Sequence, residues 1–169
     1  LFSFLGAQHF VPAYLAESDN PYLSMNVFVY EALLDGNVLE AGDEIGIFDL
    51  YAITNDMDCS NQIGELLVGA GVWDGNTLNI VSIGSVDLCP FGGLQLAGYV
   101  AGNDVIVRVY KTAEGVEYDS ELTWDVGSGT FGYDDQYVSQ ITLVELGICE
   151  DDNDAYAAFG GCAGIVAAL

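Results

Sequence analysis

The sequence predicts an all-β fold, either an immunoglobulin-like or a jelly-roll β-sandwich, with apolar extensions at both ends. The first observation is composition, because 21 glycines and ten tyrosines stand beside many valines, isoleucines and threonines in a chain with few helix-forming residues. The second is that short apolar or alternating segments recur, separated by turn residues and without a helical period between them. A chain of 169 residues has room for one such domain.

Seven segments have the length and pattern of strands. We expect them at residues 25–34, 44–50, 66–73, 77–83, 104–111, 116–124 and 137–146. In the fifth, three valines alternate with larger side chains, which predicts a half-buried strand. The two faces are Val105, Val107 and Val109 on one side and Ile106, Arg108 and Tyr110 on the other.

Turn residues separate these strands. Asp-Gly-Asn occurs at residues 35–37 and again at 74–76, between Val72-Trp73 and Thr77-Leu78. The second predicts a tight hairpin, because Asp-Gly tolerates the positive φ angles of a type I′ turn. Ala-Glu-Gly at residues 113–115 predicts a further hairpin. Residues 127–132 match G-x-G-x-x-G, but they lie between two β segments rather than in a βαβ unit, so we interpret them as a flexible connection.

The ends of the chain differ from its body. We divide the chain into an apolar N-terminal extension (1–11), the sandwich (12–147) and an apolar C-terminal tail (148–169). The chain begins with Leu-Phe-Ser rather than Met, which we interpret as removal of a secretion leader. No apolar run reaches the roughly 18 residues of a membrane span. The extensions either complete their own sandwich or pair with a neighbouring subunit by strand addition.

The N-terminal segment is the favoured candidate for exchange between subunits. Phe2 and Phe4 alternate as the anchors of an inserted strand do, whereas the glycine-rich tail suits close packing between subunits. The predicted assembly residues are Phe2, Phe4, Leu5, Phe10, Phe159, Ile165 and Val166.

Charge and apolar content oppose each other in this chain. Its 26 acidic residues face only Lys111 and Arg108, which gives a net charge of −24, yet 51% of the residues are hydrophobic. The charge argues against nucleic acid and anionic membranes as partners. The apolar content asks for more burial than a lone domain of this size supplies. Packing against copies of the same chain, with cations screening the acids, would satisfy both demands.

The four cysteines predict two disulfides. They show no C-x-x-C spacing and the chain has a single histidine, His9, so a zinc site is not indicated. Three pairings are possible, and we prefer the local one, Cys59–Cys89 and Cys149–Cys162.

Clusters of acids are candidate Ca²⁺ ligands, since this ion prefers oxygen ligands in flexible loops. We expect a site at Asp151, Asp152 and Asp154, and next at Asp56 and Asp58. For any one cluster the competing interpretation is a solvated acidic loop.

Three short stretches point to a known kind of module. They are Ala-Gly-Asp-Glu-Ile-Gly-Ile-Phe-Asp (41–49), Val-Gly-Ala-Gly-Val-Trp (68–73) and Gly-Tyr-Val-Ala-Gly-Asn (98–103). In this order, over residues 12–143, the chain resembles a β-sandwich module of large secreted and surface-attached bacterial proteins. The resemblance implies the fold and no catalytic residues. The insert at 50–66 and the tail after residue 147 depart from the pattern, and no sorting domain follows, which suggests a free-standing subunit.

We therefore expect a structural subunit of a secreted, self-assembling extracellular filament, tube or sheath, located outside the cell or on its surface, with its own copies as partners. No motif supports an enzyme, because His9 lacks a nucleophile and carboxylates pair by chance in so acidic a chain. The alternative is a calcium-stabilised adhesin or carbohydrate-binding module that takes a surface polysaccharide. Its sugar platform would come from Tyr14, Tyr22, Tyr30, Tyr51, Tyr99, Tyr133, Tyr137, Tyr156, Trp73 and Trp124.

Overall fold

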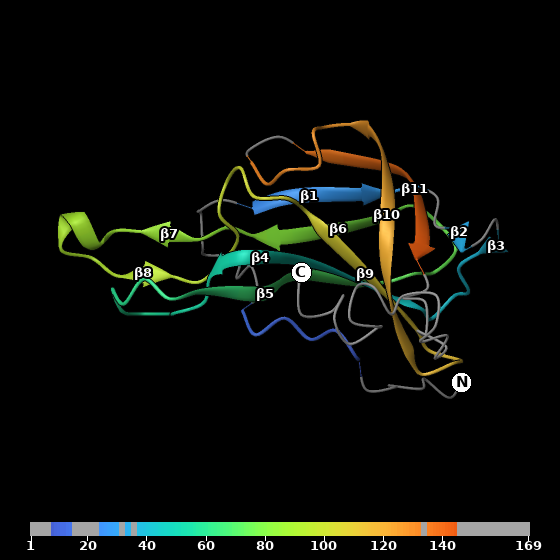
Figure 1. The fold of residues 1–169 in the computed structure, drawn as a ribbon, viewed down its shortest axis with the longest axis horizontal. Coiled ribbons are helices and arrows are strands. Elements are labelled where there is room, and N and C mark those ends of the chain that lie inside the picture. The colour runs from blue at the N-terminus through green and yellow to red at the C-terminus, as the bar shows by residue number, and fades with distance from the viewer. Residues whose placement is uncertain (1–7, 15–23, 31–32, 35–36, 133–134, 145–169) are drawn as a thin grey trace, which may run out of the picture.

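The computed structural model describes residues 8–14, 24–30, 33–34, 37–132 and 135–144. In these residues the chain is all-β, which confirms the predicted class (Figure 1). The elements are β1 (Ser24–Val29), β2 (Leu33–Leu34), β3 (Asn37–Val38), β4 (Glu44–Ile53), β5 (Ile63–Val72), β6 (Leu78–Ile83), β7 (Val86–Asp87), the 3-10 helix η1 (Cys89–Phe91), β8 (Gln95–Leu96), β9 (Ile106–Lys111), β10 (Val116–Val126) and β11 (Gln136–Val144). This part of the chain holds no helix of the length and apolarity that crossing a membrane requires.

One mixed sheet forms most of the molecule. Its strand order is β3-β2-β11-β10-β9-β4-β5, and β1 joins β11 in parallel and β6 antiparallel. The sheet curls until it is nearly closed, which brings β6 back toward β5 (Figure 1). Among the described residues, β3, β5 and β6 are each paired along one side only. The sheet therefore keeps open edges.

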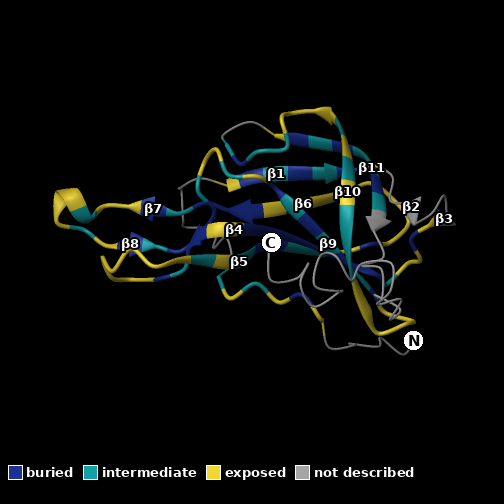
Figure 2. Ribbon diagram, in the orientation of Figure 1, coloured by how far each residue is buried: buried dark blue, intermediate teal, exposed yellow. Residues whose placement is uncertain are grey.

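The core lies inside this curl, where buried side chains from β1, β4, β5, β6, β9 and β11 pack together (Figure 2). The predicted alternation of β9 is confirmed, since Val107 and Val109 are buried and Arg108 is half-buried. The strands β5 and β6 lie close together at Gly69. A Cβ on Gly69 would lie 2.9 Å from the Val81 carbonyl oxygen, so a glycine here lets β6 approach β5 closely.

The hairpin predicted at residues 74–76 is wrong. Trp73 is buried and exchanges backbone hydrogen bonds with the segment before β4, donating to the Asp43 carbonyl and accepting from the Gly42 amide, each at 2.8 Å. Burial of the Trp73 indole in the core keeps the end of β5 beside β4. β6 therefore pairs with β1 and not with β5. The other Asp-Gly, at 35–36, lies outside the described residues, and the strands on either side of it, β2 and β3, pair antiparallel.

The two other predicted turns are present. Residues 113–115 join β9 and β10, which pair from Lys111 and Val116 onward, so that hairpin is confirmed. Residues 127–132 join β10 to β11 without a helix, but they are held more firmly than a flexible connection would be. Phe131 is buried, donates its amide to the Asn103 carbonyl at 2.8 Å and accepts the Gly102 amide at 2.7 Å. This connection forms part of the wall of the core.

An arm projects from one end of the curled sheet, along the long axis of the molecule (Figure 1). It consists of residues 54–62, between β4 and β5, and of residues 86–96, which hold β7, η1 and β8. The predicted disulfide Cys59–Cys89 is confirmed and joins these two parts, with a Cα–Cα distance of 6.0 Å. Cys149 and Cys162 lie outside the described residues, so their pairing stays a prediction.

Candidate functional site

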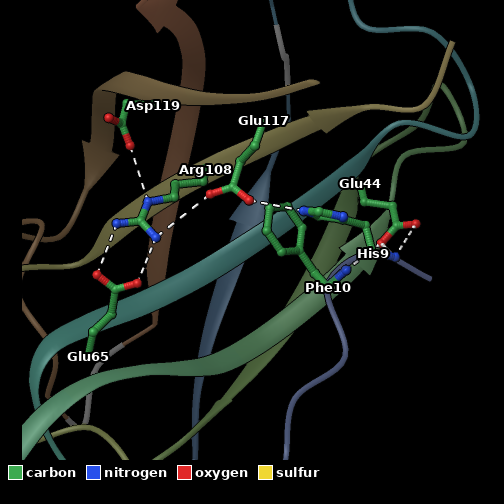
Figure 3. A network of polar contacts seen from close by, with 7 residues as sticks. All are labelled: His9, Phe10, Glu44, Glu65, Arg108, Glu117 and Asp119. Carbon is green, nitrogen blue, oxygen red and sulfur yellow. Dashed lines mark hydrogen bonds and ion pairs between the residues drawn. The ribbon is translucent and has the colours of Figure 1, made fainter. Parts of the chain in front are cut away.

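The short segment 8–14 lies on the outer face of the sheet, where a buried carboxylate holds its backbone. Glu44 begins β4 and is 6% exposed. Both of its oxygens accept the His9 amide at 2.9 Å, and one of them also accepts the Phe10 amide at 2.9 Å (Figure 3). One acidic side chain therefore accepts two consecutive amides, an arrangement that differs from strand pairing, where only alternate amides face a given neighbour.

Side-chain contacts also hold residues 8–14 against the sheet. Phe10 is buried edge-on against Phe48, with ring centroids 5.6 Å apart, and its ring lies directly over Gly46. His9 stacks on Tyr110 at 3.8 Å. A Cβ on Gly46 would lie 3.0 Å from Phe10 Cγ, so this position suits glycine. The site thus holds residues 8–14 by two backbone amides and by one large apolar side chain.

A cluster of charges borders the site around Arg108 (Figure 3). The guanidinium makes two hydrogen bonds to Glu65, at 2.7 and 3.0 Å, and one to Asp119 at 3.2 Å. Glu117 lies 3.7 Å from the guanidinium and also contacts His9 Nε2 at 3.0 Å, which links this cluster to the segment. The hydrogen bond with Arg108 lowers the pKa of Glu65 below its usual 4.5, and the same bond raises the pKa of Arg108.

Replacing Arg108 by methionine is expected to lower stability by about 1–2 kcal/mol at pH 7, because three partly exposed carboxylates would keep their charge without the cation. The pKa of Glu65 is depressed in the folded state, so its favourable contribution is complete above pH 4.5 and disappears as the pH falls through the folded pKa. The difference between Arg108→Met and wild type should therefore shrink below that pH, as measured by urea unfolding.

Arg108→Lys is the matched control, since it keeps the charge and loses the two-pronged geometry. It should recover part of the stability at pH 7. An Arg108→Met deficit that is the same at pH 3 and pH 7 would contradict the electrostatic explanation.

The structure places one predicted assembly residue, Phe10, against its own sheet. Phe2, Phe4, Leu5, Phe159, Ile165 and Val166 lie outside the described residues, so their role in assembly stays a prediction.

The predicted calcium ligands are only partly described. Asp151, Asp152 and Asp154 lie outside the described residues. Asp56 is exposed, and one oxygen of Asp58 accepts the Ser60 hydroxyl at 2.6 Å and the Ser60 amide at 2.9 Å, which lowers the pKa of Asp58. Within the described ranges, no three His, Cys, Asp or Glu side chains gather where they could hold a metal ion.

Those aromatic residues that the structure describes do not all share one surface. Trp73 is buried, and Tyr99 is stacked on Phe131 inside the core at 4.6 Å. A row does exist on the outside of β1 and β11, where Tyr137 stacks on Phe28 at 4.9 Å and on Tyr30 at 5.8 Å. Tyr22, Tyr133 and Tyr156 lie outside the described residues.

Sequence reasoning missed Glu44 and the charge cluster of Arg108. The available signal for Glu44 was an acid at a position where the strand continues into buried isoleucines, since a buried charge needs partners. Its partners lie 34 and 35 positions earlier, which no local pattern reveals. No protein-family model, curated protein or solved structure matches this chain.

Proposed function

We propose that this protein is a structural subunit of a secreted, self-assembling extracellular filament, tube or sheath, in which subunits join by strand addition and by packing of their apolar ends. The observation on which this rests is the site around Glu44, which fixes the chain's own residues 8–14 to the outer face of the sheet through the His9 and Phe10 amides. In a polymer such a site fixes the point from which residues 1–7 reach a neighbour. The disulfide Cys59–Cys89 is compatible with an oxidising compartment such as the cell exterior.

The charges also favour contacts of this kind. Arg108 and Lys111, the two cationic side chains apart from histidine, are already bound to acids of their own chain. They are therefore poorly placed to bind acids on a neighbour. Contacts between copies then depend on apolar side chains, on main-chain hydrogen bonds and on added cations, and an open edge such as β3 offers main-chain groups to an incoming strand.

Removing residues 1–7 is expected to give a folded monomer that no longer polymerises, because His9 and Phe10 keep their contacts with Glu44 while the exchanged strand is lost. Negative-stain microscopy and size-exclusion chromatography of the native and truncated chains measure this. Phe2→Ser with Phe4→Ser in the full-length chain is the matched variant, since it keeps the backbone and removes the anchors.

Normal assembly of the truncated chain would show that strand exchange from the N-terminus is wrong. A native chain that stays monomeric at high concentration would overturn the filament proposal altogether.

Calcium belongs to the same proposal, because a polymer of subunits with a charge of −24 needs cations between them. Polymer should then weaken in EGTA at constant ionic strength and recover with Ca²⁺.

A carbohydrate-binding module is the second candidate, and the observation in its favour is the aromatic row of Phe28, Tyr137 and Tyr30. Tyr30 is 48% exposed and leaves part of its ring to solvent. A native monomer that binds polysaccharide, in place of a polymer, would favour this candidate.

A further inference from the structure

A pocket of about 220 Å³ opens where β9 begins beside β4. It is lined by residues 49–51 of β4, by residues 102–104 of the segment before β9, and by Ile106 of β9 itself. A cavity of about 150 Å³ accommodates a benzene ring, so this pocket has room for a larger ring that carries polar groups.

A β-bulge in β4 turns two consecutive side chains outward at this pocket. The register of β4 on β5 shifts between Asp49 and Ala52, which are both buried. Between them, Leu50 is 39% exposed and Tyr51 is 68% exposed, although neighbours in a regular strand face opposite sides of the sheet. Bulges commonly re-aim side chains beside binding sites. Here the bulge brings an aromatic ring and an aliphatic side chain to the wall of one pocket.

The Asn103 side chain is held in one orientation beside the pocket. Its amide nitrogen donates to both oxygens of the buried Asp49, at 2.9 and 3.0 Å, and to the Tyr51 carbonyl at 3.2 Å. None of the described residues donates a hydrogen bond to its amide oxygen. The next residue, Asp104, is exposed. The pocket therefore presents a fixed amide oxygen and a carboxylate as hydrogen-bond acceptors.

These groups select a neutral ligand that donates hydrogen bonds. An anion is disfavoured, because Asp104 is acidic, no Lys or Arg lines the pocket and the chain has a charge of −24. A bare metal ion lacks ligands, since the oxygens of Asp49 already accept hydrogen bonds from their own chain. A sugar ring meets both requirements, with hydroxyl donors around its rim and C–H groups on its faces that pack against an aromatic ring.

We propose that this pocket binds one sugar residue of a neutral polysaccharide. The sugar lies with one face on the Tyr51 ring, and its hydroxyls donate to Asn103 Oδ1 and to the Asp104 carboxylate. The site goes beyond the proposed filament, because it serves a polymer and a monomer alike. It is also distinct from the aromatic row on β1 and β11, whose rings stack on one another at 4.9 and 5.8 Å. Tyr51 stacks on no ring of the described residues, which leaves its faces for a ligand.

Affinity electrophoresis in native gels that contain a soluble β-glucan, a mannan or a galactan measures this binding. The wild-type chain should migrate more slowly in at least one of these gels than in a plain gel. Tyr51→Ala should weaken the affinity by about tenfold or more, whereas Tyr51→Phe should keep most of it because the ring remains. Asp104→Ala should also cost about tenfold, through the loss of a charged acceptor, with the plain gel correcting for its altered charge.

Tyr30→Ala is the matched control, since Tyr30 is 48% exposed and lies outside the pocket. Thermal melts verify that each variant is folded. Equal affinity of Tyr51→Ala and wild type, or migration unchanged in all three gels, overturns the inference. Loss of binding in Tyr30→Ala alone also overturns it and moves the sugar to the aromatic row. The filament is tested separately by microscopy, so a polymer without sugar binding leaves the filament standing, and a monomer that binds sugar through Tyr51 supports the inference alone.

Discussion

Asp49→Ala is expected to destabilise the fold by about 3 kcal/mol, because it removes a fully buried carboxylate that several donors share. One oxygen accepts the Tyr51 amide at 2.8 Å and the other the Val100 amide at 2.8 Å. The Asn103 side-chain amide reaches both, at 2.9 and 3.0 Å. Without Asp49 these donors lose their acceptor, and urea unfolding followed by the fluorescence of buried Trp73 measures the loss.

Asp104→Ala is the matched control for this prediction. Asp104 is an exposed acid beside the same connection, so its loss should change stability by no more than about 0.5 kcal/mol. Asp49→Asn should fall between the two, because an amide keeps the size of the side chain but turns a donor toward other donors. Equal effects of Asp49→Ala and Asp104→Ala would show that Asp49 acts only through net charge.

Gly98→Ala is expected to cost about 4 kcal/mol or to prevent folding. Gly98 has a φ of +153° and exchanges backbone hydrogen bonds with Ile53 at 3.0 and 3.1 Å. A Cβ there would lie 2.3 Å from the Gly84 carbonyl carbon and 2.5 Å from the Ser85 nitrogen. Both are backbone atoms, so relief would require separating the segments that meet at the base of the arm.

Gly102→Ala separates steric overlap from backbone conformation. Gly102 also has a positive φ, +94°, but nothing lies within 4 Å of a Cβ placed there. Its substitution should cost only the conformational term, about 1 kcal/mol. Thermal melts of Gly98→Ala and Gly102→Ala measure this difference. Similar losses of stability in the two variants would mean that the close approach of Gly98 to Gly84 contributes nothing.

Asp49 and Gly98 belong to two of the stretches on which the resemblance to a secreted module rests. In the structure these two stretches contact each other, since Asp49 at the end of residues 41–49 accepts hydrogen bonds from Val100 and Asn103 of residues 98–103. Asp43 has a similar role at the start of the first stretch, where it accepts the Glu40 amide at 3.0 Å and the Thr112 amide at 3.0 Å. The acids of this motif therefore join segments of the fold.

What the sequence by itself determined were features that consecutive residues express. Alternation located the strands and put Val107 and Val109 on one face, because side chains of a strand point to opposite faces in turn, and the structure shows that face to be buried. Proximity in sequence favoured the pair Cys59–Cys89, which the structure confirms.

Only the tertiary structure decided which distant segments meet. The Asp-Gly at 74–75 predicted a hairpin that does not form. Trp73 is buried beside β4, and the burial of a large aromatic side chain outweighs a local turn preference. Glu44 could be recognised as the holder of the segment 8–14 only after the sheet had placed its carboxylate under the amides of His9 and Phe10. A buried acid takes whichever donors the packing brings to it, and those donors lie tens of residues away, beyond the reach of any local pattern.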